Sequence, residues 1–323
     1  MSAEHRPLGE SGLTVTPVSL GCWPMAGVNT PGASHEGGVA SVHAALDAGV
    51  THFDTAYVYG PNGESDRILC EALSGRWSEV SVASKVGIHY EDGQMVQDAR
   101  PETIHAECDT LLTRLGVERV DLLYLHSPDP ETPVAETAGA ISELIASGKA
   151  RSAGASNCSL EQLQEFASAC PLAAVQLPYN MLQRDIEQRT RPWCREHHIA
   201  MMVYWPLMKG LLSGAYPREY VFGEGDSRKN YPMFQGEEWQ KNQDFLDELR
   251  AAAGLTGISV TQLVVNWTMN QSGITSVLCG AKRPEQILES AGAMDAKLTD
   301  EQLDKIELAL QRRGKAAVKR LFE

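Results

Sequence analysis

The chain has 323 residues, of which 43% are hydrophobic and 22% are charged, close to the ordinary usage of globular proteins. Its formal net charge is −14, and the acidic residues are spread along the chain rather than gathered in blocks. This charge argues against a surface that binds nucleic acid or an anionic membrane through electrostatics.

The cysteine pattern indicates the compartment. Seven cysteines stand at wide spacing, their number is odd, and no C-x-x-C occurs, which argues against a disulfide framework or a zinc site. The first ten residues are polar and lack the apolar centre of a signal peptide, and no apolar run is long enough to span a bilayer. The sequence therefore predicts a cytoplasmic protein with reduced thiols and no membrane partner.

The predicted elements begin with residues 5–21, where weak alternation and turn residues predict a small hairpin followed by a buried strand at 18–21. Seven further apolar runs with little strict alternation predict strands that are buried on both faces. These runs are residues 51–54, 80–85, 120–126, 151–156, 174–177, 201–204 and 275–278. Helical patterns separate them, at residues 35–48, 101–115, 133–146, 160–169, 185–197 and 260–270, and from residues 64 and 284 onward.

Eight strands, each followed by a helix, predict an α/β protein with a (β/α)8 TIM barrel and an N-terminal β-hairpin. Two more helical patterns, residues 239–253 and 299–311, predict two extra helices. No flexible linker divides the chain, so we expect a single domain over residues 1–323. The rival fold, a doubly wound sheet, usually carries a G-x-G-x-x-G fingerprint, which this sequence lacks.

Two segments stand outside the repeating pattern. Residues 210–238 are rich in glycine, proline, tyrosine and charge and show no clear element. A loop of this length in a compact domain is usually functional, so we expect a lid or cofactor loop, with Arg228 or Lys229 as phosphate contacts. Residues 312–323 are basic and are predicted to form a surface tail.

Polar side chains stand where the predicted strands end, which is the edge at which parallel α/β proteins build their active sites. Asp54 ends the second strand, and Tyr59 follows five residues later. Lys85 ends the third strand, and a buried ammonium needs a partner, which Asp54 on the neighbouring strand can provide. His126 ends the fourth strand. Each residue alone could cap a turn or pack at the rim, but their convergence at one barrel mouth predicts an active site.

Seven motifs occur in an order that is specific, although each motif alone is weak. They are G-V-T-H-F-D-T-A-Y-V-Y-G, S-V-A-S-K, D-L-L-Y-L-H-S-P-D-P, G-A-S-N-C, V-Q-L-P-Y-N, Y-W-P-L-M-K-G-L-L-S-G and G-A-K-R-P-E-Q. With this set the sequence resembles the aldo-keto reductase family over nearly its whole length. The resemblance implies a (β/α)8 barrel that binds NADP(H) across the carboxyl ends of its strands and reduces a small carbonyl compound, an aldehyde or a ketone, to an alcohol.

The family's catalytic tetrad falls on Asp54, Tyr59, Lys85 and His126 of this sequence. The resemblance implies that Tyr59 donates the proton and that the Lys85 cation lowers the pKa of this phenol from about 10. Asp54 would keep Lys85 charged, and His126 would bind the carbonyl oxygen. Trp23 matches a position that lines the substrate pocket beside Tyr59 and His126. No metal is required by this chemistry.

The resemblance also implies a cofactor site spread over the ends of several strands. In chain order its residues are Gly21, Trp23, Asp54, Ser156, Asn157, Gln176, Tyr204, Pro206, Leu207, Lys209, Gly210, Gly280, Lys282, Arg283, Gln286, Glu289 and Ser290. Among them, Ser156, Asn157 and Gln176 would hold the nicotinamide carboxamide. Tyr204 would stack on the nicotinamide ring and select the face that gives up hydride.

The phosphate and adenosine contacts of the cofactor site match the family pattern at one pair of residues and depart from it at three positions. Lys282 and Arg283, beside a predicted helix start, would suit the 2′-phosphate of NADP. Trp205 stands where the family commonly has serine, which removes one phosphate hydrogen bond. Ser290 stands where asparagine often contacts adenine, and Cys279 replaces a common proline.

Several alternatives stay open at this point. Some members of the family are cofactor-sensing regulatory subunits with little or no turnover, and others act mainly as dehydrogenases of a sugar or polyol. Lys85 could also form a Schiff base in an aldolase-type barrel. The sequence leaves open the natural substrate, the preference for NADPH over NADH, and the oligomeric state.

Overall fold

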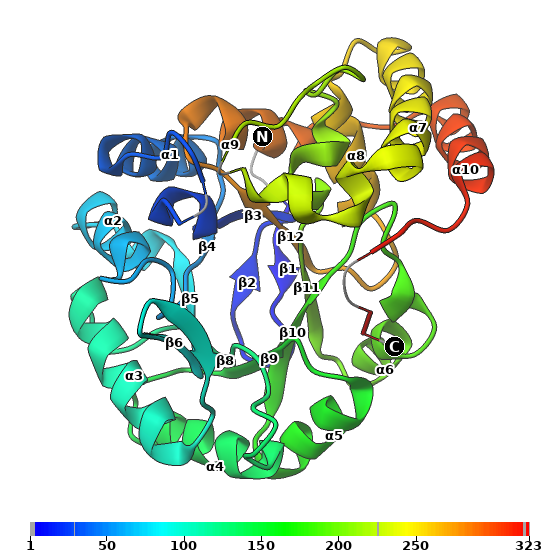
Figure 1. Cartoon of the computed structure of the whole chain (residues 1–323). Helices are drawn as coiled ribbons and strands as arrows, with labels where there is room; N and C mark the ends of the chain where they lie inside the picture. Colours follow the sequence, from blue (N-terminus) through cyan, green and yellow to red (C-terminus); the bar gives the residue numbers. More distant parts are fainter. Residues whose placement is uncertain (1–3, 29, 225, 319–320, 323) are drawn as a thin grey trace.

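The computed structural model describes residues 4–28, 30–224, 226–318 and 321–322. In this part of the chain, eight parallel strands close into a barrel in the order in which the chain makes them, with helices around it (Figure 1). The strands are β3 (Val18–Gly21), β4 (His52–Asp54), β5 (Ser81–Val86), β8 (Leu122–Leu125), β9 (Ala153–Ser156), β10 (Leu172–Pro178), β11 (Ala200–Tyr204) and β12 (Ser276–Gly280). The predicted (β/α)8 barrel is confirmed, and every barrel strand overlaps a predicted run.

The helices also follow the predicted pattern, with one correction. They are α1 (His35–Asp47), α2 (Glu64–Ala72), α3 (Pro101–Leu115), α4 (Val134–Ala146), α5 (Leu160–Ala169), α6 (Thr190–Glu196), α8 (Val260–Met269) and α9 (Pro284–Ala291), with α7 (Gly236–Gly254) and α10 (Asp300–Arg313) as the two extra helices. The predicted helix at 185–197 is wrong, because a short 3-10 turn, Asp185–Glu187, precedes α6. A continuous helix would place Pro192 in its interior, whereas proline is tolerated in the first turn.

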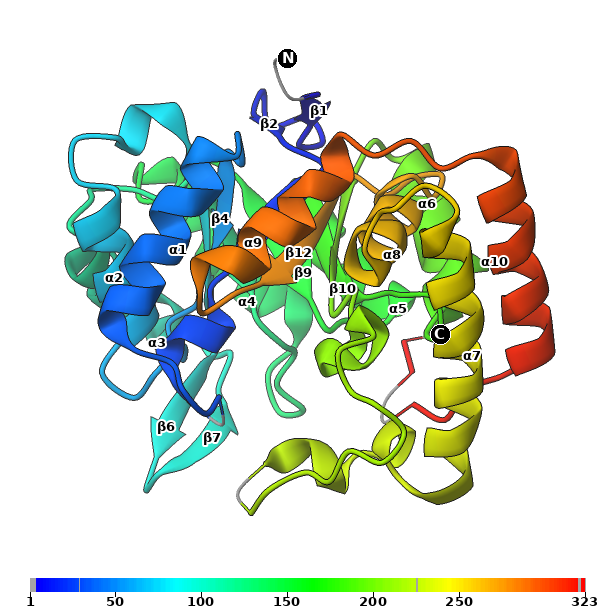
Figure 2. The ribbon, with the colours of Figure 1, turned by 90° about the horizontal axis from the view of Figure 1, so that it is seen from above.

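Two hairpins lie at opposite ends of the barrel (Figure 2). The predicted N-terminal hairpin, β1 (Arg6–Pro7) and β2 (Thr14–Val15), covers the amino-terminal end. A second hairpin, β6 (Ile88–Glu91) and β7 (Gln94–Gln97), extends from the carboxyl-terminal end and was not predicted. Its tip is Asp92-Gly93, with φ of 48° and 77°. Such an Asp-Gly pair is a strong hairpin signal, so the sequence did contain the information.

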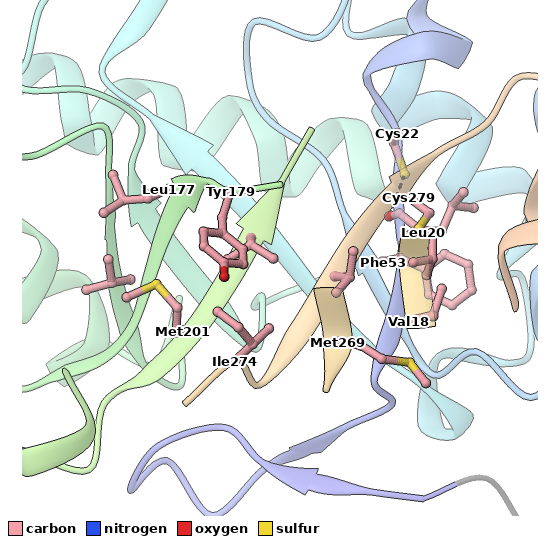
Figure 3. Packing of buried hydrophobic residues seen from close by; sticks show 14 of the residues in the cluster. Val18, Leu20, Cys22, Phe53, Leu177, Tyr179, Met201, Met269, Ile274 and Cys279 are labelled. Atoms are coloured by element: carbon pink, nitrogen blue, oxygen red, sulfur yellow. Dashed lines mark hydrogen bonds between the residues drawn. The ribbon is translucent and has the colours of Figure 1, made fainter. Parts of the chain in front are cut away.

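The buried side chains form two clusters because successive strand residues point to opposite faces. The outer cluster fills the space between the strands and the helices and includes Val18, Leu20 and Phe53 (Figure 3). The inner cluster fills the barrel interior and includes Tyr124 and Met202, with Leu8, Val15 and Leu13 from the N-terminal hairpin segment. On each strand, the inward-pointing residues continue as far as the carboxyl end. This alternation determines which side chains reach the barrel mouth.

Residues 210–238 are more ordered than their composition indicates. Three short 3-10 helices occur in or at the start of this segment: Met208–Ser213, Ser227–Asn230 and Pro232–Phe234. The ring of Phe222 packs against the rings of Tyr220, Phe234 and Trp239 at centroid separations of 5.0, 5.1 and 5.9 Å. This aromatic cluster anchors the loop on the first turn of α7.

The described residues of the predicted surface tail, 312–323, are mostly exposed, but several of them contact the rest of the protein. The Arg313 side chain is 2% exposed and forms an ion pair with Glu238 of α7. Ala316 and Phe322 are buried, and the Phe322 N–H donates to Asp185 Oδ2 at 2.5 Å. The tail therefore packs back on the molecule, while residues 319, 320 and 323 lie outside the described part. In the ranges that are described, no helix is both long enough and apolar enough to cross a membrane.

One close contact in the barrel interior gives a test of the packing. Gly154 of β9 faces Tyr124 of β8, and a Cβ at Gly154 would lie 2.3 Å from two ring carbons of Tyr124. We expect Gly154→Ala to lower the free energy of unfolding by about 1–3 kcal/mol in urea denaturation, because the ring has to move. Gly139→Ala on α4 is the matched control, since its Cβ would meet nothing within 4 Å. The control should gain about 0.5–1 kcal/mol, and a similar loss in both variants would contradict this account.

Candidate active site

The four residues of the predicted tetrad meet at the carboxyl end of the barrel. Asp54 is the last residue of β4, Lys85 lies near the end of β5, and His126 directly follows β8. Tyr59 lies in the loop between β4 and α2. In the same loop, the Tyr57 N–H donates to the Lys85 carbonyl oxygen at 2.9 Å. This bond ties the loop to β5, so the Tyr59 side chain is held beside the strand ends.

Lys85 is the centre of the cluster. Its Nζ donates to Asp54 Oδ1 at 2.5 Å, to the Thr55 carbonyl oxygen at 2.9 Å and to the Tyr59 hydroxyl at 3.0 Å. An ammonium group has three N–H donors, so all of them are used. The Lys85 side chain is 1% exposed, and the expected ion pair with Asp54 is present. Sequence reasoning missed Thr55, because a backbone carbonyl exists at every residue and gives no sequence signal.

The protonation states follow from this geometry. Burial lowers the pKa of Lys85, but the nearby Asp54 and Tyr59 together outweigh burial and raise it above its ordinary value. Lys85 is therefore a cation at neutral pH. Lys85 does lower the pKa of Tyr59, but the prediction that this pKa falls below its usual value is wrong. Burial raises the pKa of Tyr59 by more than the Lys85 cation lowers it, so the phenol keeps its proton at neutral pH.

Two further rings surround the Tyr59 phenol. The Trp23 ring meets it edge to face at a centroid separation of 5.1 Å, and the His126 ring does so at 5.9 Å. Burial, followed by the Lys85 cation, holds the pKa of His126 well below its usual value, so the imidazole is neutral. Its Nδ1 is buried and has no hydrogen-bond partner in the described part of the chain. The structure thus brings the predicted substrate residues Trp23, Tyr59 and His126 together.

The predicted carboxamide residues form a continuous network on the neighbouring strand ends. The Tyr204 hydroxyl donates to Asn157 Oδ1 at 2.8 Å, and Asn157 Nδ2 donates to Ser156 Oγ at 3.1 Å and to the His126 carbonyl oxygen at 2.8 Å. Ser156 Oγ donates to the Gln176 carbonyl oxygen at 2.9 Å. These primary amides and hydroxyls can recognise a carboxamide, which both donates and accepts hydrogen bonds.

The loops beyond β11 and β12 gather positive charge. Burial lowers the pKa of Lys282 most, and the positive charges of Arg283 and then Arg228 lower it further. An anion placed among them would relieve this repulsion, so the group fits a phosphate. Arg228 lies in the 210–238 loop, where Asp226 pairs with it at 2.5 Å. The residues predicted to bind a nicotinamide and a phosphate therefore lie on the same end of the barrel.

The remaining predicted cofactor residues lie around these two groups. Gly21 and Gly280 pair across β3 and β12, and Pro206, Leu207, Lys209 and Gly210 follow β11. Lys209 Nζ stands 4.9 Å from the ring centroid of Trp205 and 4.6 Å from that of Tyr231.

The predicted cofactor residues on α9 differ in their exposure to solvent. Gln286 and Glu289 lie on α9, and Gln286 Oε1 accepts from the Lys282 N–H at 3.0 Å. Ser290 is 3% exposed and interacts with the Cys279 thiol. The structure therefore does not bring Ser290 to the surface on which Glu289 is exposed.

Comparisons with known proteins agree with this geometry. Residues 17–311 match the sequence profile of the Aldo/keto reductase family. The chain is similar to the aldo-keto reductase yakc of Schizosaccharomyces pombe, whose name specifies NADP(+), with 31% identity over 315 residues that cover 96% of this chain and 92% of the relative. It is also similar to the NADH-specific methylglyoxal reductase of Escherichia coli, with 32% identity over 314 residues that cover 91% of this chain and 94% of the relative.

A solved structure shows the same relationship. The glycerol dehydrogenase of Gluconobacter oxydans superposes with a TM-score of 0.89 and 32% sequence identity, covering 100% of both chains. The sequence profile, the relatives and this structure agree with the barrel fold. The chain belongs to the aldo-keto reductase family, whose members are oxidoreductases that use a nicotinamide cofactor.

Proposed function

We propose that the protein is an NADP(H)-dependent reductase of a small aldehyde or ketone, with Tyr59 as the proton donor. The observation that carries the proposal is the contact of the Tyr59 hydroxyl with Lys85 Nζ at 3.0 Å, beside the Lys85–Asp54 ion pair. A protonated phenol held next to a permanent cation is suited to give a proton to a developing alkoxide. Trp23 and His126 flank the same hydroxyl-bearing ring and line the place for the carbonyl compound.

Each residue of the site has a separate task. Ser156, Asn157 and Gln176 would hold the nicotinamide, and this group would supply hydride for the carbonyl carbon when it is bound. Tyr59 Oη gives its proton to the carbonyl oxygen, and the charge left on the phenolate is stabilised by Lys85 Nζ. Asp54 keeps Lys85 charged and oriented. The neutral His126 imidazole can donate one N–H to the carbonyl oxygen and orient it, and its low pKa prevents it from competing with Tyr59 as the acid.

The protonation states bear on the alternatives. A Schiff-base lysine has to be unprotonated to attack a carbonyl group, whereas the pKa of Lys85 is raised and its three donors are used. Oxidation of an alcohol needs Tyr59 without its proton, and the raised pKa of Tyr59 disfavours this form at neutral pH. Reduction uses the protonated phenol, which is the form that the raised pKa favours at neutral pH, and a structural relative is named for the dehydrogenation of glycerol.

The preference for NADP(H) rests on the cationic group at the ends of β12 and the loop after β11. One relative is named for NADP(+) and another is NADH-specific, so family membership leaves the choice of cofactor open. Burial lowers the pKa of Lys282 most, and the charges of Arg283 and Arg228 lower it further. Asp226 already pairs with Arg228, whereas a 2′-phosphate would supply negative charge to Lys282 and Arg283, and NADH has no such phosphate.

The proton donor is tested by replacing its hydroxyl. We expect Tyr59→Phe to lower kcat by about 100- to 10,000-fold in NADPH oxidation with an activated aromatic aldehyde, because the proton source is removed. Tyr57→Phe is the matched control, since the Tyr57 ring packs under the Arg114 guanidinium at 4.4 Å and takes no part in the proposed chemistry. Equal rates for Tyr59→Phe and the parent would exclude Tyr59 as the proton donor.

The role of Lys85 is tested through the pH dependence of kcat. The cation lowers the pKa of Tyr59, so its removal in Lys85→Met raises this pKa further. We expect a severe loss of kcat with cofactor affinity retained, and the alkaline fall of the residual reduction rate should move to higher pH. The unfolding midpoint is measured alongside, because methionine leaves Asp54 buried without its cation. An unchanged rate and pH profile would remove Lys85 from the mechanism.

The phosphate site is tested by comparing two cofactors. We expect Lys282→Ala combined with Arg283→Ala to raise the Kd for NADPH by about 10- to 100-fold in fluorescence titrations, because charged hydrogen bonds are lost. The Kd for NADH should change little. Lys305→Ala removes an exposed cation on α10 and serves as the control for net charge. Equal weakening of both cofactors by the double variant would show that the 2′-phosphate binds elsewhere.

A further inference from the structure

One hydrogen bond crosses the mouth of the barrel. Gln176 Nε2 donates to Asp54 Oδ2 at 2.8 Å, and the two side chains come from β10 and β4. In the closed barrel, three strands separate β10 from β4 in either direction, so the bond joins opposite walls. Gln176 is 3% exposed and Asp54 is 2% exposed, so water does not take the place of either partner.

This bond connects two networks that otherwise lie on different walls. On one wall, Asp54 Oδ1 accepts from Lys85 Nζ, which also donates to the Tyr59 hydroxyl. On the other wall, the Gln176 carbonyl oxygen accepts from Ser156 Oγ, which accepts in turn from Asn157 Nδ2. The first network handles the proton, and the second contains the residues for the nicotinamide carboxamide.

A buried carboxylate needs donors at both of its oxygens. Lys85 supplies the donor to Asp54 Oδ1, and Gln176 supplies the donor to Oδ2. With both oxygens fixed, the carboxylate cannot rotate, and Lys85 Nζ keeps its place between Asp54 and Tyr59. Without Gln176, one oxygen of a buried charge would lose its donor, and the orientation of Lys85 would rest on a single contact to that carboxylate.

We propose that Gln176 is a positioning residue for proton transfer, and that it couples the carboxamide site to the Asp54–Lys85–Tyr59 chain across the barrel. This inference rests on the proposed function of the site. A primary amide can donate through Nε2 while its Oε1 accepts from another N–H, so one side chain can serve Asp54 and a carboxamide together. Cofactor recognition and the alignment of the proton donor then depend on the same residue.

The first test separates kcat from cofactor affinity in Gln176→Leu. We expect kcat at saturating NADPH to fall by about 10-fold or more, as for the loss of a hydrogen bond to a buried charge. Gln176→Glu keeps the side-chain shape and should recover activity as the pH falls, since its protonated carboxyl group can again donate to Asp54.

The matched control is Gln302→Leu. Gln302 is also a buried glutamine, and its Nε2 donates to the Ala252 carbonyl oxygen at 3.0 Å, but it lies on α10 outside the barrel (Figure 1). This variant should lose stability while keeping the parent's kcat and pH profile. A Gln176→Leu protein with weaker NADPH binding but the parent's kcat and pH profile would overturn the proposal and leave Gln176 as a cofactor contact alone.

A second measurement needs no turnover. We expect Gln176→Leu to lower the unfolding midpoint by more than Gln302→Leu does, because the lost hydrogen bond goes to a buried carboxylate and not to a neutral carbonyl oxygen. An equal loss in the two variants would overturn the proposal. If the parent oxidised no NADPH with any carbonyl compound, the proposed function would fail, while this comparison would still decide the role of Gln176.

Discussion

The site depends on one ion pair, between Lys85 and Asp54, that is buried at the mouth of the barrel. Removing two charges from water costs several kcal/mol for each ion, and the cost is offset only when geometry and additional hydrogen bonds are favourable. Here every donor of Lys85 is used, by Asp54, the Thr55 carbonyl oxygen and Tyr59. These contacts offset the cost of burying the ion pair, and they also place the Lys85 cation against the Tyr59 phenol. The stability of the site and its chemistry therefore depend on the same contacts.

The barrel supplies this arrangement through the alternation of its strands. In β5 the inward row runs from Ala83 in the barrel interior to Lys85 at the mouth, and in β10 it runs from Ala174 to Gln176. The alternate residues on these strands point outward and pack under the helices, as Val82 and Val175 do. A shift of one residue in the pairing of any strand would send its polar end group into the outer apolar layer. The core packing therefore fixes the register on which the site depends.

The electrostatics of the mouth differ from those of the whole chain. The chain carries a net charge of −14, yet Lys282, Arg283 and Arg228 gather on the loops that follow β11 and β12. Lys209 is held over the rings of Trp205 and Tyr231 nearby. A local positive region on an acidic protein can bind a phosphate-bearing cofactor while the rest of the surface repels polyanions. This distribution reconciles the acidic composition with the proposed preference for NADP(H).

The order and type of the barrel strands and of most helices follow from the sequence, because strand runs, helix starts and glycine stops are local patterns. The sequence also predicted that Asp54, Lys85 and His126 would meet, since the ends of parallel strands lie on one edge. The hairpin at Asp92-Gly93 was recognisable in principle from its turn residues. The balance of charges and the contacts across the barrel, in contrast, exist only in the folded chain. The pKa of Tyr59 depends on how deeply the ring is buried, which no local pattern reports. The bond from Gln176 to Asp54 joins residues 122 positions apart, and it exists because barrel closure brings opposite walls within reach of two side chains.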